Sequence, residues 1–322
     1  MHATSLQDRH QKALEYIIKQ DQGGWWPYHP GQRPSVEATA WCTIALCKQV
    51  KIGKSVGSYL LATQNADGGW STAPGIGQSD WGTSLALLTL GILSRELAGG
   101  QDSDFRKSCQ RGISLLMARR AQLYTAIGSV ILFLLQGPDV LDYPRGWPWT
   151  AGCFHWVEPT SYTLLALKLM PGDQDPEVRD AVKQASTYLL SVACTGGGWN
   201  YGNNITLGAH LPPYPVTTAE VITALQDWPD HKAVKEALTF LNSAAPAQAT
   251  IMSLSWAILA KNALGEDVSG EISSLVDQQH PDGSFGDNLL LSGLATCALA
   301  AGDNRNPLKF GAPASPATEV NK

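Results

Sequence analysis

Two kinds of helical segment alternate along this chain. Apolar residues recur at the spacing of one helix face, for example Leu14, Ile17 and Ile18, a pattern that is typical of α-helices. The first segment of each pair also carries charges, such as Lys12 and Glu15, whereas the second is almost uncharged beyond its first turn. The first helix therefore has one face in water, and the second is buried on most sides.

Six such pairs follow one another with a period of about 45 to 55 residues, which indicates a repeat architecture. The pairs are 7–20 with 35–49, 54–64 with 79–93, 105–120 with 158–170, 178–194 with 217–226, 232–244 with 249–264, and 271–279 with 289–300. We expect an all-α fold, a single α6/α6 toroid of six helical hairpins with inner and outer helix rings. It would span residues 1–302, with an inserted apolar segment at about 119–145 and a disordered tail at 303–322.

A glycine-aromatic phrase recurs between the two helices of a pair. It reads QDQGGWWPY at 20–28, QNADGGWST at 64–72, CTGGGWNYG at 194–202 and QQHPDGSFG at 278–286. Glycine permits the left-handed backbone that ends a helix, and the aromatic residue can fill the gap between neighbouring hairpins. The preceding glutamine can bond backbone groups at a helix end. We therefore interpret the phrase as structural and not catalytic.

The amino-acid composition favours some classes of function and argues against others. Charged residues make up 16% and hydrophobic residues 44%, with 11 tryptophans, so much apolar surface must be buried or face an apolar ligand. The net charge of −5 argues against nucleic-acid binding, which needs a basic face. The six cysteines form no CxxC pair and suit buried thiols in a reducing compartment. Because no secretory signal is visible at the start of the sequence, we expect a cytoplasmic location, at the inner face of the membrane where the chain contacts it.

The phrases QNADGGW and QQHPDGSF, together with GWPW and WVEPTSYTLLAL further along, resemble the repeats of the squalene-hopene cyclase and oxidosqualene cyclase superfamily. The β subunits of protein prenyltransferases share its toroid. The resemblance covers about residues 8–301 and is closest to short, single-toroid bacterial members. It implies a polyprenyl or similarly apolar substrate in a central aromatic cavity, and acid-initiated carbocation cyclisation or isomerisation by an isomerase or lyase.

The DxDD acid motif of those cyclases is missing here. When the segments are aligned on the threonine that follows the motif, Glu158 stands where the proton-donating aspartate would lie. Glu37 occupies the same place in another repeat, and Asp80 lies one residue earlier in a third. A carboxylic acid in a dry aromatic pocket has a raised pKa and can protonate an alkene. The alternative is that Glu158, followed by Pro159, caps a helix.

Aromatic residues in or just before the inner helices could line the cavity and stabilise a carbocation, although plain core packing is the alternative. The predicted substrate-binding residues are Trp41, Trp81, His155, Trp156, Tyr162 and Trp256. His155 is the candidate to hydrogen-bond Glu158. Neither the zinc set of the prenyltransferases nor a nucleotide or flavin motif is present, so we expect no metal and no cofactor.

Residues 106–137 suggest peripheral membrane contact. Five basic residues precede an apolar run of about 15 residues, shorter than the roughly 20 that span a bilayer, so this segment would lie on the membrane or pack as an extra helix.

Two other functions remain open. One is a non-catalytic isoprenoid-binding or scaffold protein that has lost the acid motif, and the other is a polysaccharide-active enzyme with paired carboxylates.

Overall fold

Twelve α-helices and one short β-hairpin form within the part of the chain that the computed structural model describes, residues 5–96, 103–120, 145–170, 175–244 and 249–310. The outer helices are α1 (Leu6–Lys19), α3 (Val50–Thr63), α5 (Ser103–Ala118), α8 (Pro176–Ser191), α10 (Lys232–Ala244) and α12 (Ser269–Val276). The inner helices are α2 (Val36–Ala45), α4 (Gly82–Glu96), α7 (Val157–Leu169), α9 (Pro215–Ala224), α11 (Ile251–Leu264) and α13 (Leu289–Gly302). Strands β1 (Ile205–Thr206) and β2 (Ala209–His210) pair antiparallel in the loop before α9. All six predicted pairs are present.

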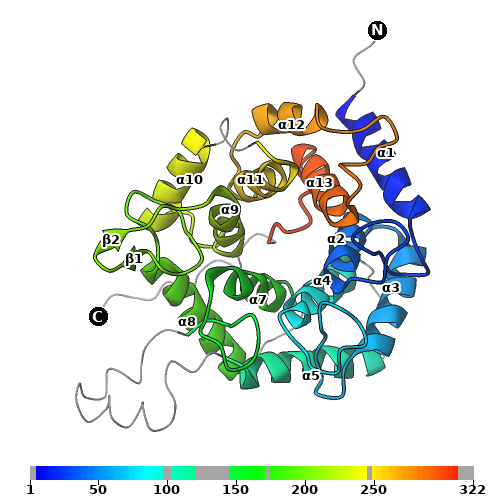
Figure 1. Ribbon diagram of the computed structural model, residues 1–322, viewed down its shortest axis with the longest axis horizontal. Coiled ribbons are helices and arrows are strands. Elements are labelled where there is room, and N and C mark those ends of the chain that lie inside the picture. Colours follow the sequence, from blue (N-terminus) through cyan, green and yellow to red (C-terminus); the bar gives the residue numbers. More distant parts are fainter. Residues whose placement is uncertain (1–4, 97–102, 121–144, 171–174, 245–248, 311–322) are drawn as a thin grey trace.

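The inner helices close into a ring (Figure 1). Each contacts the inner helices of the two neighbouring pairs, and α13 packs against α2, so the last repeat meets the first. In α4 every residue from Gly82 to Leu93 is buried, because an inner helix has protein on all sides. The outer helices keep one face in solvent. The predicted α6/α6 toroid is confirmed.

The glycine-aromatic turns join the two helices of a pair. The backbone N–H of Trp70 donates to Oγ1 of Thr83 in α4, and this hydroxyl donates to the carbonyl of Trp70, both at 3.0 Å. The Trp70 indole N–H donates to the carbonyl of Leu60 near the end of α3, at 2.8 Å. The same three bonds recur at Trp26, Trp147 and Trp199. This confirms the structural interpretation of the phrase.

The same turns also contact the next outer helix. Gly197 has a φ of +100°, and a Cβ there would lie 2.4 Å from the carbonyl oxygen of Glu236 in α10, so only glycine fits. At the end of α12, the Gln279 amide donates to the carbonyls of Gly283 in its own turn and of Arg9 in α1, at 3.2 and 2.9 Å. The turns therefore fasten the outer helices to one another around the periphery.

Residues 303–310 pack on the ring, which corrects the expected start of the disordered tail at 303. Leu308 is buried, and its carbonyl accepts the Gln226 amide at 3.0 Å. The Asn306 amide donates to the carbonyl of Leu259 in α11 at 2.9 Å, and Arg95 of α4 donates to the Pro307 carbonyl at 2.8 Å.

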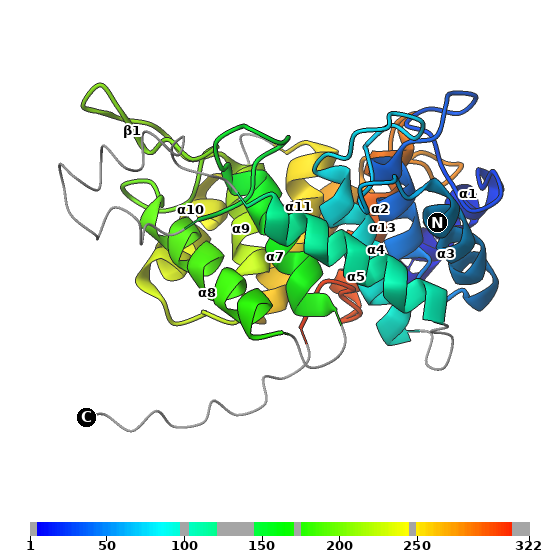
Figure 2. The same ribbon diagram turned by 90° about the horizontal axis from the view of Figure 1, so that it is seen from below.

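In Figures 1 and 2 this red segment crosses the ring at the end opposite the β-hairpin. Its polar composition suggested disorder, but its polar groups pair with backbone and side chains near the ends of the inner helices. The rest of the predicted tail, 311–322, and nearly all of the predicted insertion at 119–145 lie outside the described residues.

Candidate active site at the hub of the ring

The repeated hydroxyl residues Thr39, Thr83, Thr160 and Thr218 define which side chains face the hub. Each bonds its own outer turn, so it points away from the ring centre. Successive residues of an α-helix are rotated by about 100°, which places the residues two before and two after each hydroxyl on the opposite, inner face. The residues two before include Glu37, Trp81 and Glu158, and those two after include Trp41, Tyr162 and Glu220.

Glu37 and Glu158 both lie in the first turn of an inner helix, and the charge of Glu37 acts on Glu158. Burial and the Glu37 carboxylate raise the pKa of Glu158 to about 7, against the opposing effect of a hydrogen bond from Thr217 in α9. Burial also raises the pKa of Glu37, whose Oε2 accepts the Tyr28 hydroxyl at 2.5 Å. The structure thus brings the two predicted acids together from α2 and α7.

A third acid, Glu220 of α9, was missed by the sequence analysis. It is only 3% exposed, its Oε1 accepts the Tyr162 hydroxyl at 3.1 Å, and its Oε2 has no hydrogen-bond partner among the described residues. Burial and the charge of Glu158 raise its pKa well above the usual range, which favours the neutral form of the side chain. The available signal was a lone charge inside the apolar run TTAEVITAL, two residues after the threonine instead of two before it.

A row of aromatic rings crosses the hub beside these acids. Trp41 contacts Trp256 edge to face with ring centroids 5.2 Å apart, and Trp256 contacts Tyr162 at 6.0 Å. Trp81 continues the row at 5.8 Å from Tyr162, and lies 5.0 Å from Trp149, which the sequence analysis did not select. Four of the six predicted substrate-binding residues are therefore brought together.

Two of these rings are enclosed by protein. Trp41 is 1% exposed and Trp256 is 0% exposed, so neither lines an open cavity. The packing alternative therefore describes both side chains in this state of the molecule. A ligand would reach them only after a rearrangement of the hub.

The remaining predicted residues lie apart from this group. Both carboxylate oxygens of Asp80 accept bonds in its own turn, from Thr72 at 3.0 Å and from the Gly82 N–H at 2.8 Å. The ring of His155 packs on Tyr188 of α8, with centroids 4.2 Å apart, and burial lowers its pKa. The expected His155–Glu158 bond is not formed within the described part of the chain, because His155 turns toward the outer helix. Trp156 is the N-cap residue of α7 and is half-exposed on the rim.

The end of the ring that carries the acids also has an apolar surface. Leu207, at the tip of the β1–β2 hairpin, is fully exposed, and the hairpin projects beyond the helices (Figure 2). Other exposed apolar side chains on the loops that lead into α7 and α9 are Phe154, Trp156, Tyr201, Ile205, Leu211 and Tyr214. An apolar molecule that approaches the hub from this end meets apolar side chains first.

The basic residues of α5 and the loop after it are mostly used inside the molecule. Arg111 donates to the backbone of Asn65 and Ala66, Arg119 pairs with Asp67 at 2.8 Å, and Arg120 bonds Gln184. Arg106 and Lys107 remain on the surface. The apolar run 121–137 falls outside the described residues. Within the residues that are described, no helix is both long and apolar enough to cross a bilayer.

The hub has the chemistry of a proton donor. Among the described residues, none of the three glutamates forms an ion pair with a lysine or arginine, and no group of three His, Cys, Asp or Glu side chains is placed to hold a metal. A neutral carboxylic acid can deliver a proton to a weakly basic group, and aromatic faces attract the cation that results.

No protein-family model matches the sequence, and no curated protein matches it significantly. Solved structures do match its fold. The type II terpene cyclase MstE from Scytonema, in complex with its substrate geranylgeranyl dihydroxybenzoate, has a TM-score of 0.62 at 14% identity, over 93% of this chain and 98% of that chain. A protein from Actinoplanes has a TM-score of 0.60 at 16% identity, over 93% and 100%. A glycosidase in complex with glucose has a TM-score of 0.61 at 11% identity, over 95% and 98%. The chain thus has the α/α toroid of the type II terpene cyclases, a fold that glycosidases also use.

Proposed function

We propose that this protein is a terpene-cyclase-like enzyme that binds a polyprenyl or similarly apolar chain at the hub and starts carbocation cyclisation or isomerisation by proton transfer. The observation that carries the proposal is the set of buried acids, Glu37, Glu158 and Glu220, beside a row of aromatic rings and without a cationic partner among the described residues. Proton donation needs carboxylic acids that are held in the neutral form, and burial raises the pKa of all three.

In the proposed reaction, Glu158 transfers its proton to one carbon of a terminal alkene, and the π-electron pair forms the new C–H bond. The carbocation is attacked by the next alkene of the chain, and the final cation loses a proton to a carboxylate. The product is an isomer of the substrate, so no co-reactant is consumed. Glu220 lies deeper and either protonates a more deeply bound chain or shares the proton of Glu158. Asp80 has no part, because both of its oxygens are already bonded.

Deuterium labelling tests the proposal directly. Linear polyprenyl alcohols and hydrocarbons of increasing length are incubated with the protein in D2O, and the products are analysed by mass spectrometry. Acid initiation places one solvent deuteron on carbon in each product molecule. We expect Glu158→Gln and Glu220→Gln each to lower the yield about 100-fold or more. Glu177→Gln, an exposed acid on α8, is the matched control and should keep full activity. Deuterium-free product, or equal yields from all variants, would contradict the proposal.

A second candidate is a non-catalytic isoprenoid-binding or scaffold protein. The specific observation in its favour is the complete enclosure of Trp41 and Trp256, which leaves this part of the hub filled with side chains. This candidate predicts that a fluorescent polyprenyl probe binds the wild type and both glutamine variants alike and that no product forms in any of them. Hydrolysis of glucosides without any binding of polyprenyl chains would favour a glycosidase instead.

The proposal includes peripheral membrane contact through 106–137. Arg106 and Lys107 are the described residues that would face anionic headgroups, since the other arginines of this stretch make internal contacts. Co-sedimentation with vesicles of anionic lipid tests this contact. We expect the double substitution Arg106→Glu and Lys107→Glu to weaken binding severalfold. Unchanged sedimentation would exclude this surface.

A further inference from the structure

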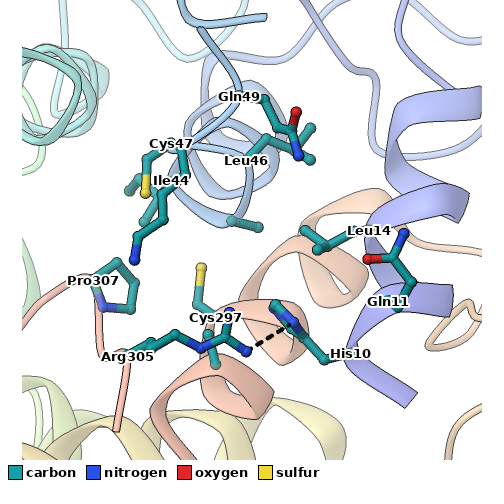
Figure 3. Close-up of a pocket in the computed structure, with 13 residues that line it drawn as sticks. His10, Gln11, Leu14, Ile44, Leu46, Cys47, Gln49, Cys297, Arg305 and Pro307 are labelled. Carbon is teal, nitrogen blue, oxygen red and sulfur yellow. Dashed lines mark hydrogen bonds between the residues drawn. The ribbon is translucent and has the colours of Figure 1, made fainter. Parts of the chain in front are cut away.

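A cavity lies away from the acids, at the seam where the last repeat meets the first. It has a volume of about 250 Å³ and opens between α1, the C-terminal ends of α2 and α13, and the segment 303–310 (Figure 3). The cavity is therefore large enough for a small organic ligand but not for a polyprenyl chain.

The polar groups in this cavity are mainly donors. Arg305 donates from Nη2 to Nδ1 of His10 at 3.4 Å, and because an arginine cannot accept, the proton of a neutral His10 sits on Nε2. His10 is 7% exposed, and its Nε2 has no partner among the described residues. The histidine therefore holds a buried N–H without an acceptor, and because this atom has almost no accessible surface, a ligand in the cavity reaches it only after a small shift of the side chain. Figure 3 shows His10 and Arg305 side by side on one wall.

The positive charge of the lining residues favours an anion as the hydrogen-bond acceptor. Lys48 and Arg305 line the cavity, and no aspartate or glutamate is among its described lining residues. Asp303 fixes the guanidinium of Arg305 from outside the lining at 2.9 Å and leaves its other N–H groups available. The two lining thiols stay neutral, since burial raises the pKa of Cys47 to about 11 and raises that of Cys297 well above its usual range.

The rest of the wall is apolar. Leu14, Ile44, Leu46 and Pro307 contribute hydrocarbon surface opposite the donors. A bare inorganic anion would leave this surface without a partner, whereas a molecule with a charged head and a short hydrocarbon body would match both sides. We propose that this seam cavity binds a small amphiphilic anion, a carboxylate with a short alkyl or aryl body, whose head accepts from His10, Arg305 and Lys48.

Such a ligand would join two parts of the fold that are distant in sequence. His10 belongs to α1, and Arg305 belongs to the segment that crosses the ring below the hub. Binding would hold that segment against the first repeat and stabilise the closed ring, because a ligand that binds only the folded state raises its stability. This inference does not depend on the chemistry at the hub.

Titration calorimetry with hexanoate tests the proposal, with hexan-1-ol and acetate as probes that lack the charge and the apolar body. We expect hexanoate to bind, to raise the unfolding temperature, and to shift the His10 ring nitrogens in spectra of protein labelled with ¹⁵N-histidine. Each control probe should bind at least about tenfold more weakly. Inorganic phosphate should not compete.

Two variants locate the binding. Arg305→Gln should weaken hexanoate binding about tenfold or more, and Lys48→Gln, an exposed change that the fold tolerates, about three- to tenfold. Lys51→Gln removes the same charge from the exposed side of α3, outside the cavity lining, and should bind like the wild type. No binding by the wild type, equal binding by all variants, unmoved His10 signals, or tighter binding of phosphate or hexan-1-ol would each overturn the proposal.

Discussion

Glu158 couples the hub to the stability of the whole protein. Its pKa of about 7 in the folded state lies above the ordinary glutamate value of about 4.3, so the folded protein holds more protons than the unfolded chain between these pH values. The stabilisation is complete below about pH 4 and is lost as the pH rises through 7. The glutamine of Glu158→Gln cannot ionise. We therefore expect the free energy of unfolding of this variant to exceed that of the wild type by about 1–3 kcal/mol between pH 5 and 8.

Urea unfolding at each pH measures this difference, and the titration of all other groups largely cancels in the comparison. Glu177→Gln, at an exposed acid, should follow the wild-type pH dependence. If wild type and Glu158→Gln give parallel curves, the carboxyl is not held neutral by the hub.

Substitution of Thr218 measures how much its hydrogen bonds to the preceding turn stabilise the protein. Its hydroxyl accepts the Trp199 backbone N–H at 2.9 Å and donates to the Trp199 carbonyl at 3.2 Å. Thr218→Val keeps the shape but leaves a buried N–H without a partner, so the free energy of unfolding should fall by about 1–3 kcal/mol. Thr218→Ser should recover most of the loss. The exposed Thr187 of α8 is the control, and Thr187→Val should change stability by no more than about 0.5 kcal/mol.

At the scale of elements, two adjacent glycines separate backbone conformation from close packing. Gly196 and Gly197 both have positive φ, +88° and +100°, but only Gly197 lies against α10. Gly196→Ala should cost about 1 kcal/mol for the left-handed conformation alone. Gly197→Ala must also displace the backbone of Glu236, and we expect a further loss of about 1–3 kcal/mol. Equal losses in chemical denaturation would mean that the turn does not fasten neighbouring outer helices.

Helices, turns and the acid-bearing end of the ring could be predicted because each is encoded locally. A charged helix takes the outer position and its uncharged partner the inner one. Because Glu37 and Glu158 each stand two residues before a repeated threonine, their side chains lie on the hub face. Glu220 could not be predicted in this way, because the family's acid motif precedes the threonine and Glu220 stands two residues after it. The packing of residues 303–310 could not be read from their polar, proline-rich surroundings, since their partners include Gln226, just after α9, and Leu259 of α11. Such long-range pairing leaves no periodic signal.

At the scale of the whole molecule, closure of the ring distinguishes this fold from an open array of hairpins. In an open array the end repeats have one neighbour, and a change at their outer faces costs little. Here α13 packs on α2, and a Cβ on Gly293 would lie 2.7 Å from the backbone of Trp41 and Cys42. We expect Gly293→Ala to destabilise the protein by about 1–3 kcal/mol through this contact.

Because every inner helix has two neighbours, damage at the seam should be shared by all six pairs. Tryptophan fluorescence and far-ultraviolet circular dichroism of Gly293→Ala should therefore show one common transition, shifted to lower urea. Gly91→Ala, on α4, is the matched control, because its Cβ would lie 3.3 Å from Leu169, a contact that a small shift can relieve. A Gly293→Ala protein as stable as Gly91→Ala, or one whose two probes separate, would indicate that the seam is not closed in solution.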